Sequence, residues 1–512
     1  MKLQELLHDL KILGVRNPIG YQEITGISNH SMNVEKGDIY VAIKGYITDG
    51  HKYVADAYSN GAIAAIVEEF VENCEIPQYK VENTRKALSI ISDKFYHHPS
   101  RDLRVIGVTA TNGKTTTTYM LNKIMEEAGF KSGLIGSVIN KIGDEFIPAV
   151  LTTPESLDLQ RLLYKMKEER VEKVAMEVSS SALELERVNN VDFDIVSFNN
   201  FSREHIDQHG SFEKYWEVKS SLIKNAKAGS FAILNLDDEY SMSLVGETNA
   251  TVITYSLKEE VGNFYAKDLE LANGRAKFTV VINKPYVAFG KKIEMREFPI
   301  VLGVPGYHSA ANAMAAIAIA ITDGISPEVI QEALLYFSGV ERRFQYIYER
   351  DFIIIDDHFA NKGNINVTLE TLNSMDYNNL HLVYAIRGNR GVTVNRENAE
   401  TLAQWKDKLK LNEIIATKST EVVTSKDLVT SKEEEIFDGV MENAGIKVHK
   451  YDKLEDAIKY ALSNVKKDDI VLLAGCQGMD HGGKVALNYI HELKPEIPKE
   501  ELYKPIKDRV VE

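Results

Sequence analysis

A short loop rich in small residues offers the clearest chemistry in this sequence. Gly107-Val-Thr-Ala-Thr-Asn-Gly-Lys-Thr115 follows an apolar run typical of a buried strand and precedes a helix-forming stretch, residues 116–129. Backbone N–H groups in such a loop can surround phosphate oxygens, and the helix dipole favours their negative charge. We expect Lys114 to reach the outer phosphates and the Thr115 hydroxyl to hold Mg²⁺. Because five residues separate Gly107 from Gly113, one more than in the usual phosphate loop, a strand–helix turn without a ligand is the alternative.

Acids and histidines stand at the ends of later predicted strands or in nearby loops. Glu177 ends one such strand, and His205, Asp207 and His209 form a group further on. The carboxyl edge of a parallel sheet is where ligands bind in folds of this type. Carboxylate and imidazole ligands suit Mg²⁺ or Mn²⁺ bound to phosphates. We therefore expect these residues to gather near the phosphate loop.

The elements that must position these residues alternate between strands and helices. Strands are predicted in the central part at 103–109, 173–177, 193–198 and 231–235, and later at 352–356, 380–386, 413–416 and 469–474. Apolar runs separated by helices favour mostly parallel sheets covered on both faces.

The expected fold class is therefore α/β with three domains. Residues 1–98 form a small α/β domain, 99–338 a central P-loop ATPase domain with a parallel sheet, and 339–512 a C-terminal Rossmann-like domain. The break at His97-His-Pro-Ser100 predicts the first linker. The last stretch, from 494 to 505, carries three prolines and many charges, and we expect it to dock on the surface or to fray.

Composition narrows the classes of function. The 512 residues are 44% hydrophobic and 26% charged, with a net charge of −15, which argues against general binding to nucleic acid. Two cysteines are too few for a disulfide framework and fit a reducing cytoplasm. No apolar run is long enough to predict a membrane span. We expect a cytoplasmic monomer or weak oligomer.

The loop and several later motifs together resemble the ATP-dependent Mur ligases, and most closely their muramyl tripeptide synthetase branch. The family's loop usually reads Gly-Thr-Asn-Gly-Lys-Thr, with Ala110 here in place of the first Gly. The matching motifs are Leu151-Thr-Thr-Pro154, Glu177-Val-Ser-Ser180, Asn200-Phe-Ser-Arg-Glu-His-Ile-Asp-Gln-His-Gly210, Tyr215-Trp-Glu-Val-Lys219 and Asn235-Leu-Asp-Asp238. The resemblance is close over about residues 100 to 320.

The resemblance implies an enzyme that uses ATP to convert a carboxylate into an acyl phosphate, which an amine then attacks to form an amide. It implies Lys114, His205 and Lys219 as catalytic residues and Thr115, Glu177, His205 and Lys219 around Mg²⁺. Nucleotide contacts are implied for Thr111, Asn112, Gly113, Lys114, Thr115, Thr116, Asn312, Arg343 and Asp357, and acyl-substrate contacts for Ser31, Thr152, Thr153, Ser179 and Arg187. For Arg187 a solvated helix charge is the alternative.

Lys219 falls where the family carries a carbamylated lysine. An ammonium beside Mg²⁺ and Lys114 would be repelled, and reaction with CO₂ would change its charge from about +1 to −1. The resemblance therefore implies an N6-carboxylated Lys219. A lysine on a helix surface is the alternative.

The departures from the family concentrate at the two ends of the chain. The first domain keeps Gly37–Gly45 and Asp49-Gly-His51, but the usual Asp-Ser-Arg reads His30-Ser-Met32. In the third domain the Asp-Asn-Pro-Arg motif associated with diaminopimelate is absent, and Thr417-Lys-Ser-Thr-Glu421 stands nearest. The half that binds ATP and the acid is thus kept, while the half that binds the amine is rewritten.

We therefore expect an ATP-dependent carboxylate–amine ligase that acts on a nucleotide-sugar peptide or a similar acid and adds an amine other than diaminopimelate. One alternative keeps the chemistry and uses a non-muramyl acid from secondary metabolism or a polyamino acid. A second alternative, from another class, is a nucleotide-binding partner subunit without ligase activity.

Overall fold

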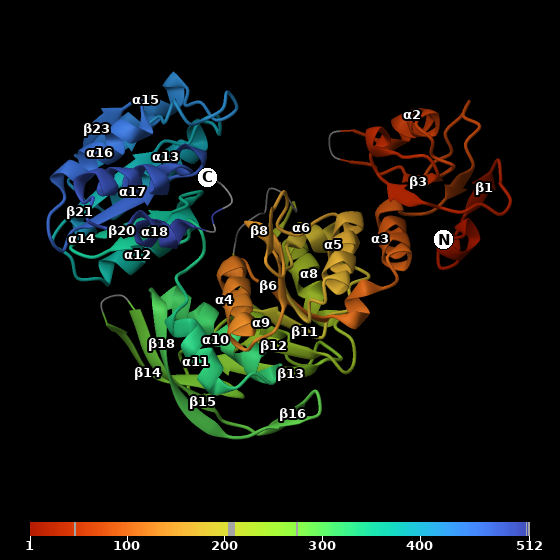
Figure 1. Ribbon diagram of the computed structural model, residues 1–512, viewed down its shortest axis with the longest axis horizontal. Coiled ribbons are helices and arrows are strands. Elements are labelled where there is room, and N and C mark those ends of the chain that lie inside the picture. The colour runs from red at the N-terminus through yellow and green to blue at the C-terminus, as the bar shows by residue number, and fades with distance from the viewer. Residues whose placement is uncertain (46–47, 203–209, 273–274, 508, 510–512) are drawn as a thin grey trace. The chain divides into compact units, whose positions relative to one another are not determined.

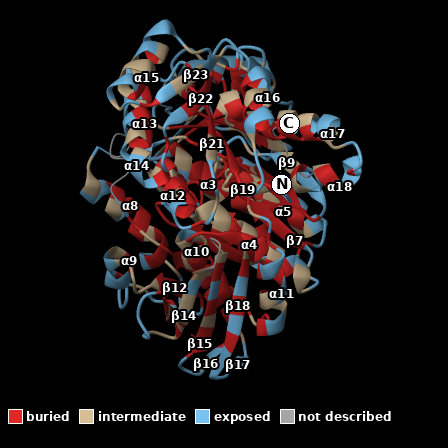
Figure 2. Cartoon of the chain, turned by 90° about the vertical axis from the view of Figure 1, so that its left-hand side faces the viewer, coloured by how far each residue is buried: buried red, intermediate tan, exposed pale blue. Residues whose placement is uncertain are grey.

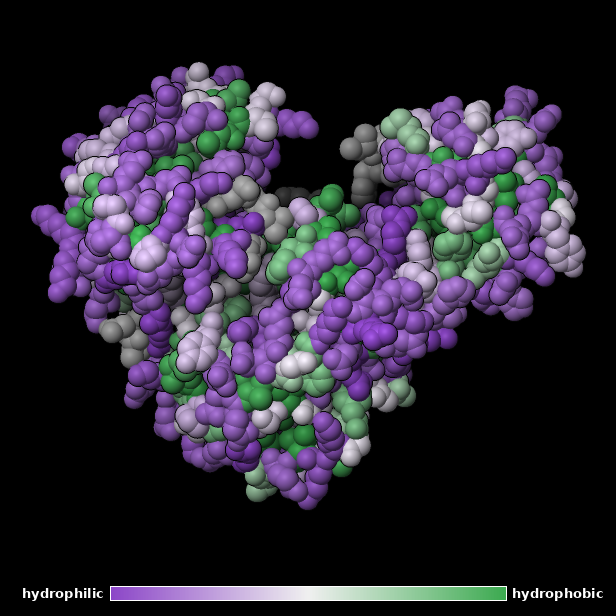
Figure 3. All heavy atoms as spheres, viewed as in Figure 1, coloured by the Kyte–Doolittle hydropathy of each residue, from purple (hydrophilic) through white to green (hydrophobic). Residues whose placement is uncertain are grey.

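The computed structural model describes residues 1–45, 48–202, 210–272, 275–507 and 509 (Figure 1). The chain forms two compact units, one of Met1–Lys114 with Ala128–Thr254, the other of Thr115–Glu127 with Tyr255–Glu512. In the part of the chain that is described, no helix is long and apolar enough to cross a membrane. The face seen in Figure 3 is mostly hydrophilic, with hydrophobic residues in small patches.

A small sheet forms the N-terminal part of the first unit. Its strands run in the order β1-β5-β4-β3-β2, with only β1 antiparallel to its neighbour. The central strands β3 and β4 are buried along their length, because one face packs on α1 and α3 and the other on α2. The elements are α1 (Leu3–Leu7), β1 (Gly14–Arg16), β2 (Gly26–Ser28), β3 (Asp38–Val41), α2 (Val54–Ser59), β4 (Ala64–Val67), β5 (Gln78–Lys80) and α3 (Thr84–Phe95), with 3-10 turns at Ser31–Asn33, Gly50–Tyr53 and Pro99–Asp102.

A larger sheet in the first unit carries the phosphate loop. Its strands run in the order β12-β11-β6-β10-β7-β8-β9. The first five are parallel, and β8 and β9 extend the sheet in antiparallel fashion. The strands are β6 (Arg104–Thr109), β7 (Ser132–Ile135), β8 (Ile139–Ile142), β9 (Glu145–Pro148), β10 (Lys173–Glu177), β11 (Ile195–Phe198) and β12 (Phe231–Asn235). Because β10 and β11 flank β6, the residues that follow these three strands meet at one edge of the sheet.

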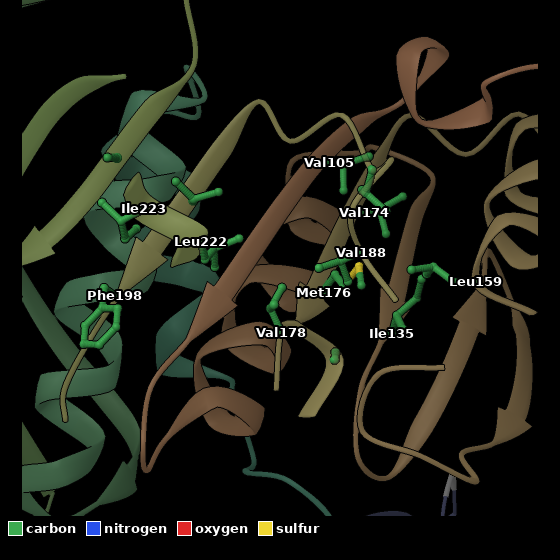
Figure 4. Close-up of a cluster of buried hydrophobic side chains, with 14 of the residues drawn as sticks. Val105, Ile135, Leu159, Val174, Met176, Val178, Val188, Phe198, Leu222 and Ile223 are labelled. Carbon is green, nitrogen blue, oxygen red and sulfur yellow. The ribbon is translucent and has the colours of Figure 1, made fainter. Parts of the chain in front are cut away.

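An apolar core fixes this sheet against its helices (Figure 4). Val105, Val174 and Met176 of the strands pack with Leu159 of α5 and Leu222 of α8 in one buried cluster. The helices of this part are α5 (Ser156–Glu168), α6 (Ser180–Glu184), α8 (Phe212–Lys224) and α9 (Glu239–Ser243). The mostly parallel, buried sheet agrees with the prediction from continuous apolar runs.

Antiparallel strands of the second unit were not anticipated. Here the end of β13 (Thr251–Ser256) pairs with β14 (Phe264–Ala272), and β14, β15 (Arg275–Ile282) and β18 (Arg296–Pro305) are antiparallel. Along β18 buried and exposed residues alternate, a pattern that a search for continuous apolar runs passes over. The other elements here are α4 (Lys114–Glu127), the hairpin β16 (Tyr286–Ala288) and β17 (Lys291–Ile293), α10 (Tyr307–Thr322) and α11 (Pro327–Leu335).

The C-terminal part of the second unit is a doubly wound domain, as expected. Its strands run in the order β19-β20-β24-β21-β22-β23, and only β19 is antiparallel. In Figure 2 the strand β21 is buried while the helix α15 exposes one side. The elements are β19 (Gln345–Glu349), β20 (Ile353–Asp357), α12 (Lys362–Asn373), β21 (Leu380–Ala385), α13 (Val392–Gln404), α14 (Lys406–Leu409), β22 (Glu413–Thr417), α15 (Ser431–Asn443), β23 (Lys447–Tyr451), α16 (Leu454–Asn464), β24 (Ile470–Ala474) and α17 (Gly482–Leu493).

The end of the chain docks on this domain. Leu502 of α18 (Lys499–Tyr503) and Ile506 of the turn Lys504–Ile506 are buried in the core that contains Ile347, Phe352 and Ile490. Of the two expectations for this stretch, docking is the one observed.

Candidate active site

The phosphate loop is shorter than its sequence pattern suggested. Strand β6 continues to Thr109, so the loop is Ala110–Gly113. Gly107 lies inside the strand, where an added Cβ would come within 2.7 Å of the Phe193 ring, so its glycine serves packing. Gly113 needs its glycine for a φ of +88°, whereas Ala110, at the family's first glycine position, is buried and does not have a positive φ.

Lys114 and Asn200 fix the shape of this loop. The Lys114 Nζ donates to the carbonyls of Ala110 (2.8 Å) and Thr111 (3.1 Å). Asn200, just after β11, accepts from the Asn112 N–H at 2.9 Å and donates to the Asn112 carbonyl at 2.8 Å. The Thr111 N–H also donates to the Asn200 carbonyl. Asn200 was not predicted to have this role, although its place after the strand next to β6 was a usable signal.

Glu177 is a buried carboxylate held by its neighbours. It is 0% exposed at the end of β10 and accepts hydrogen bonds from the Ser137 N–H (2.8 Å) and Oγ–H (3.1 Å). A Cβ added to Gly136 would lie 2.4 Å from Glu177 Oε1, so this glycine leaves the space that the carboxylate occupies. An oriented oxygen donor of this kind fits a hard cation such as Mg²⁺.

The predicted acyl-substrate residues of the central sheet converge on Glu177. Ser137 Oγ also lies 3.1 Å from Thr152 Oγ1, within hydrogen-bond distance. Thr153 Oγ1 donates to the Glu177 carbonyl at 2.9 Å and accepts from the Ser179 N–H at 3.1 Å. Ser137 was missed by the sequence analysis, because a serine between two strands carries no pattern of its own.

Arg187 completes this cluster. Its Nη1 donates to the Thr153 carbonyl at 3.0 Å, and its Nη2 lies 2.7 Å from Glu155 Oε1. The side chain is 10% exposed, and its Nε, although buried, has no hydrogen-bond partner. The alternative of a solvated helix charge is therefore wrong. Arg85 of α3 also approaches Glu155, at 3.4 Å, which ties the N-terminal domain to this arginine.

Lys219 is buried on α8, so the alternative of a helix-surface lysine is wrong as well. Its Nζ lies 5.3 Å from the centre of the Tyr215 ring, one helical turn earlier. The Tyr215 hydroxyl is 3.2 Å from Thr111 Oγ1 in the phosphate loop. Tyr215, which opens one of the matching motifs but had no predicted role, thus connects the helix of Lys219 to the loop.

The remaining predicted residues lie elsewhere or outside the description. His205, Asp207 and His209 lie outside the described residues. Thr115 and Thr116 lie in the first turn of α4, and Ser31 is a mostly buried residue of the N-terminal domain. Asn312, Arg343 and Asp357 belong to the second unit. Among the described residues no group of three or more His, Cys, Asp or Glu side chains could hold a metal, so the metal set stays a prediction.

In the C-terminal domain Asp357 is engaged in fixing the backbone. It accepts from the N–H groups of Phe344 (3.1 Å) and His358 (2.8 Å) and from the Thr368 hydroxyl, and burial raises its pKa. Burial, with repulsion from Arg343, Arg342 and Arg387, lowers the pKa of His358 to about 2. His358 is therefore neutral at physiological pH.

A buried arginine lies beside these residues. The Arg342 guanidinium contacts Asp356 at 3.3 Å and also Asp480, and it donates to the carbonyls of Gly475 and Cys476. Burial raises the pKa of Asp480 from 3.8 to about 6, against the attraction of Arg342.

Three family models match the chain in sequence order. They are a Mur ligase family catalytic domain over residues 23–96, a Mur ligase middle domain over 108–320 and a Mur ligase glutamate ligase domain over 342–477.

Curated relatives match almost the whole chain. A UDP-N-acetylmuramoyl-L-alanyl-D-glutamate–2,6-diaminopimelate ligase of Caldanaerobacter subterraneus is 35% identical over 477 residues, 93% of this chain and 94% of that protein. The ligase of the same name from Bacillus velezensis is 35% identical over 485 residues, with the same coverage. A solved structure of a diaminopimelate ligase of this type shares the fold, with a TM-score of 0.68 at 23% identity over 96% of this chain and 99% of the other.

Ser137→Ala tests the support of Glu177. The variant keeps the backbone N–H but loses the hydroxyl that joins Glu177 to Thr152. Loss of a residue that orients a metal ligand typically lowers metal affinity or activity roughly 10–100-fold. We expect ATP-dependent phosphate release to fall by about that factor, with a higher Mg²⁺ requirement. Ser243→Ala, on the exposed end of α9, is the matched control and should change neither. Wild-type Mg²⁺ dependence in Ser137→Ala would refute this role.

Asp480→Asn tests the buried ion pairs through pH. A carboxyl with a raised folded-state pKa contributes stability that is present below about pH 4 and lost as the pH rises through about 6. The free energy of unfolding of the wild type, relative to Asp480→Asn, should therefore fall between pH 4 and 7 in urea titrations. The groups that act on Asp480 are Arg342, Asp356, His481 and Glu341. Asp376→Asn, at an exposed position, is the control, and parallel curves for Asp480→Asn and wild type would contradict the expectation.

Proposed function

Because the chain belongs to the Mur ligase family, we propose that it joins the carboxylate of a UDP-N-acetylmuramoyl peptide to an amine through an acyl phosphate. The chain is an enzyme, an ATP- and Mg²⁺-dependent C–N ligase, as its identity of 35% to named ligases over nearly its whole length indicates. The acid and the amine that it uses are the proposed part.

The observation that carries the proposal is the convergence of five predicted residues on one edge of the central sheet. Glu177, Thr152, Thr153, Ser179 and Arg187 are linked by direct hydrogen bonds or through Ser137. The phosphate loop follows β6, the strand beside the one that ends at Glu177. An acid bound by the threonines and Arg187 would therefore lie next to the phosphates held by the loop.

Each side chain has a definite part in this proposal. ATP supplies the phosphoryl group and Mg²⁺ neutralises its charge. The loop N–H groups and Lys114 bind the phosphates and stabilise charge that develops during transfer. Arg187 offers a charged donor to the carboxylate of the acid, with Glu155 fixing its orientation. The Glu177 carboxylate contributes negative charge to the proposed Mg²⁺ site.

Lys219 is proposed to act as a carbamate. Lys219 is only 2% exposed, and burial of this kind disfavours the charged ammonium form of a lysine. An N6-carboxylate would instead give Mg²⁺ an oxygen ligand. The Tyr215 hydroxyl at Thr111 places this helix against the phosphate loop.

The amine is proposed to differ from diaminopimelate. The end of that molecule remote from the reacting amine carries both an ammonium and a carboxylate, which need charged partners. Two of the cations after β21 and β22 pair with acids of the domain instead, Arg390 with Asp427 at 3.0 Å and Lys418 with Asp452 at 2.8 Å, while Arg387 donates to the Ala360 carbonyl. Glu433 also accepts from the N–H groups of residues 389–391. An amine without a second charged end fits these loops better.

The reading with a non-muramyl acid remains the second candidate. It is favoured by His30-Ser-Met32, where the largely exposed Met32 stands in place of the family's usual arginine. The proposal further places the enzyme in the cytoplasm, as a monomer or weak oligomer, which suits its two sparse free cysteines.

A phosphate-release assay with ATP, Mg²⁺ and bicarbonate tests the proposal. UDP-N-acetylmuramoyl-L-alanyl-D-glutamate is offered with a panel of amino acids and simple amines, including diaminopimelate. We expect release that depends on both the nucleotide sugar and one amine other than diaminopimelate, and slower release without bicarbonate. Lys114→Ala should lower the rate by at least about 100-fold, because it removes a charge that acts on the transferred phosphate.

Lys123→Ala, on the same helix as Lys114, is the matched control and should keep wild-type turnover. Release with diaminopimelate alone would contradict the proposed amine. If no amine of the panel supports phosphate release while ATP still binds, a muramyl peptide is not the acid substrate and the second candidate, a non-muramyl acid, is favoured. Full turnover by Lys114→Ala would contradict the role of the loop.

A further inference from the structure

The docked tail brings a buried arginine back to the start of the C-terminal domain. The side chain of Arg509, which follows α18 and the turn Lys504–Ile506, is 2% exposed. Its Nη1 lies 2.8 Å from Asp356 Oδ2, and its Nε and Nη2 donate to Gln345 Oε1 at 3.2 and 2.6 Å. The guanidinium thus forms an ion pair with Asp356 of β20 and donates two hydrogen bonds to Gln345 of the neighbouring strand β19.

The absence of a side chain at Gly483 leaves space for this guanidinium. A Cβ added to Gly483, in the first turn of α17, would lie 2.5 Å from Arg509 Nη1. Any larger side chain at position 483 would therefore press on the arginine. Gln345 secures the tail at a second point, because its Nε2 donates to the Pro505 carbonyl at 2.7 Å.

The residues that Arg509 contacts also hold Arg342. Asp356 pairs through Oδ1 with Arg342 Nε and through Oδ2 with Arg509, while Gln345 Oε1 accepts from the Arg342 N–H at 3.2 Å. Two arginines therefore face two acids, Asp356 and Asp480, in a buried setting. Removal of one arginine would leave a buried negative charge in excess.

The segment held in this way has an unusual backbone. Arg342 has a φ of +52° and Phe344 a φ of +49°, conformations that side chains other than glycine rarely adopt. Such residues persist only where their surroundings fix them. Further bonds come from Asp357, which accepts from the Phe344 N–H, and from the His358 N–H, which donates to the Arg342 carbonyl. Arg343 stands between the two strained residues, so its direction depends on them.

We propose that Arg509 is a positioning residue that sets Arg343 and Asp357 for nucleotide binding by holding Asp356 and the 342–345 segment in place. The inference rests on the proposed function in one respect, since it takes Arg343 and Asp357 as the nucleotide contacts that the family resemblance implies for this ligase. The tail of the chain thereby becomes part of the ligase machinery without touching the substrates.

The test is nucleotide affinity, measured by fluorescence titration with a fluorescent ATP analogue and Mg²⁺, which requires no knowledge of the acid or the amine. Arg509→Gln should raise the Kd roughly tenfold and lower the Tm by roughly 5–10 °C. Arg509→Lys keeps the charge but not the forked contacts, so its Kd should lie between those of the wild type and Arg509→Gln. Lys507→Gln, on the exposed side of the same tail, is the control and should leave both quantities unchanged.

Gly483→Ala separates positioning from stability. Alanine favours the helix over glycine, so the substitution should displace the guanidinium without a matching loss of Tm. We expect its Kd to rise several-fold, and Gly439→Ala, in α15 with open space around the position, to leave the Kd unchanged.

The outcomes distinguish a failure of the positioning role of Arg509 from a failure of the proposed function. Wild-type Kd in both Arg509→Gln and Gly483→Ala, with only the Tm of the former lowered, would overturn the positioning role and leave the proposed function intact. A wild-type protein that does not bind the nucleotide at all would overturn the proposed function and this inference with it. If Arg509→Gln does not fold, Gly483→Ala and Arg509→Lys decide the question by the same Kd comparison.

Discussion

A carboxylate without access to water must be surrounded by hydrogen-bond donors, and in the central sheet this requirement falls on Glu177. An unsatisfied buried group of this kind costs about 1–3 kcal/mol or more when charged. Both donors of Ser137 meet it, and the hydroxyl of the same serine reaches Thr152. The Glu177 carbonyl in turn anchors Thr153, whose own carbonyl receives Arg187. The geometry of the acyl-substrate residues is thus a consequence of how one buried acid is satisfied.

The phosphate loop is fixed by the same sheet edge. Because β11 lies beside β6, the first residues after β11 can bond to the loop, and Asn200 does so through its amide and its backbone. Tyr215 connects the loop to the helix that carries Lys219. The positions of Lys114, Glu177, the substrate residues and Lys219 therefore follow from strand order and from a small number of buried polar contacts, and a nucleotide meets a loop that is already shaped.

Sequence patterns identified the strands and site residues that are marked by neighbouring residues in the chain. The strands at 173–177 and 231–235 are found with their predicted bounds, since continuous apolar runs mark buried parallel strands. Glu177 was found through a motif and Arg187 through the family resemblance. Asn200 and Tyr215 open two of the motifs but were given no role, and Ser137 and Arg509 lie in none of them, because each of these four residues acts through a residue far away in the sequence. The alternating strand β18 was missed because only one of its faces is buried.

The central claim is that the chain activates a carboxylate by phosphorylation before the amide forms. It is tested most directly with UDP-N-acetylmuramoyl-L-alanyl-D-glutamate labelled with ¹⁸O in its reacting carboxylate, followed by mass spectrometry of the phosphate released during amide formation. Formation of an acyl phosphate and attack of the amine on its carbonyl carbon would transfer one carboxylate oxygen to each phosphate, so the account predicts singly labelled phosphate. Unlabelled phosphate, released while the amide accumulates, would contradict it.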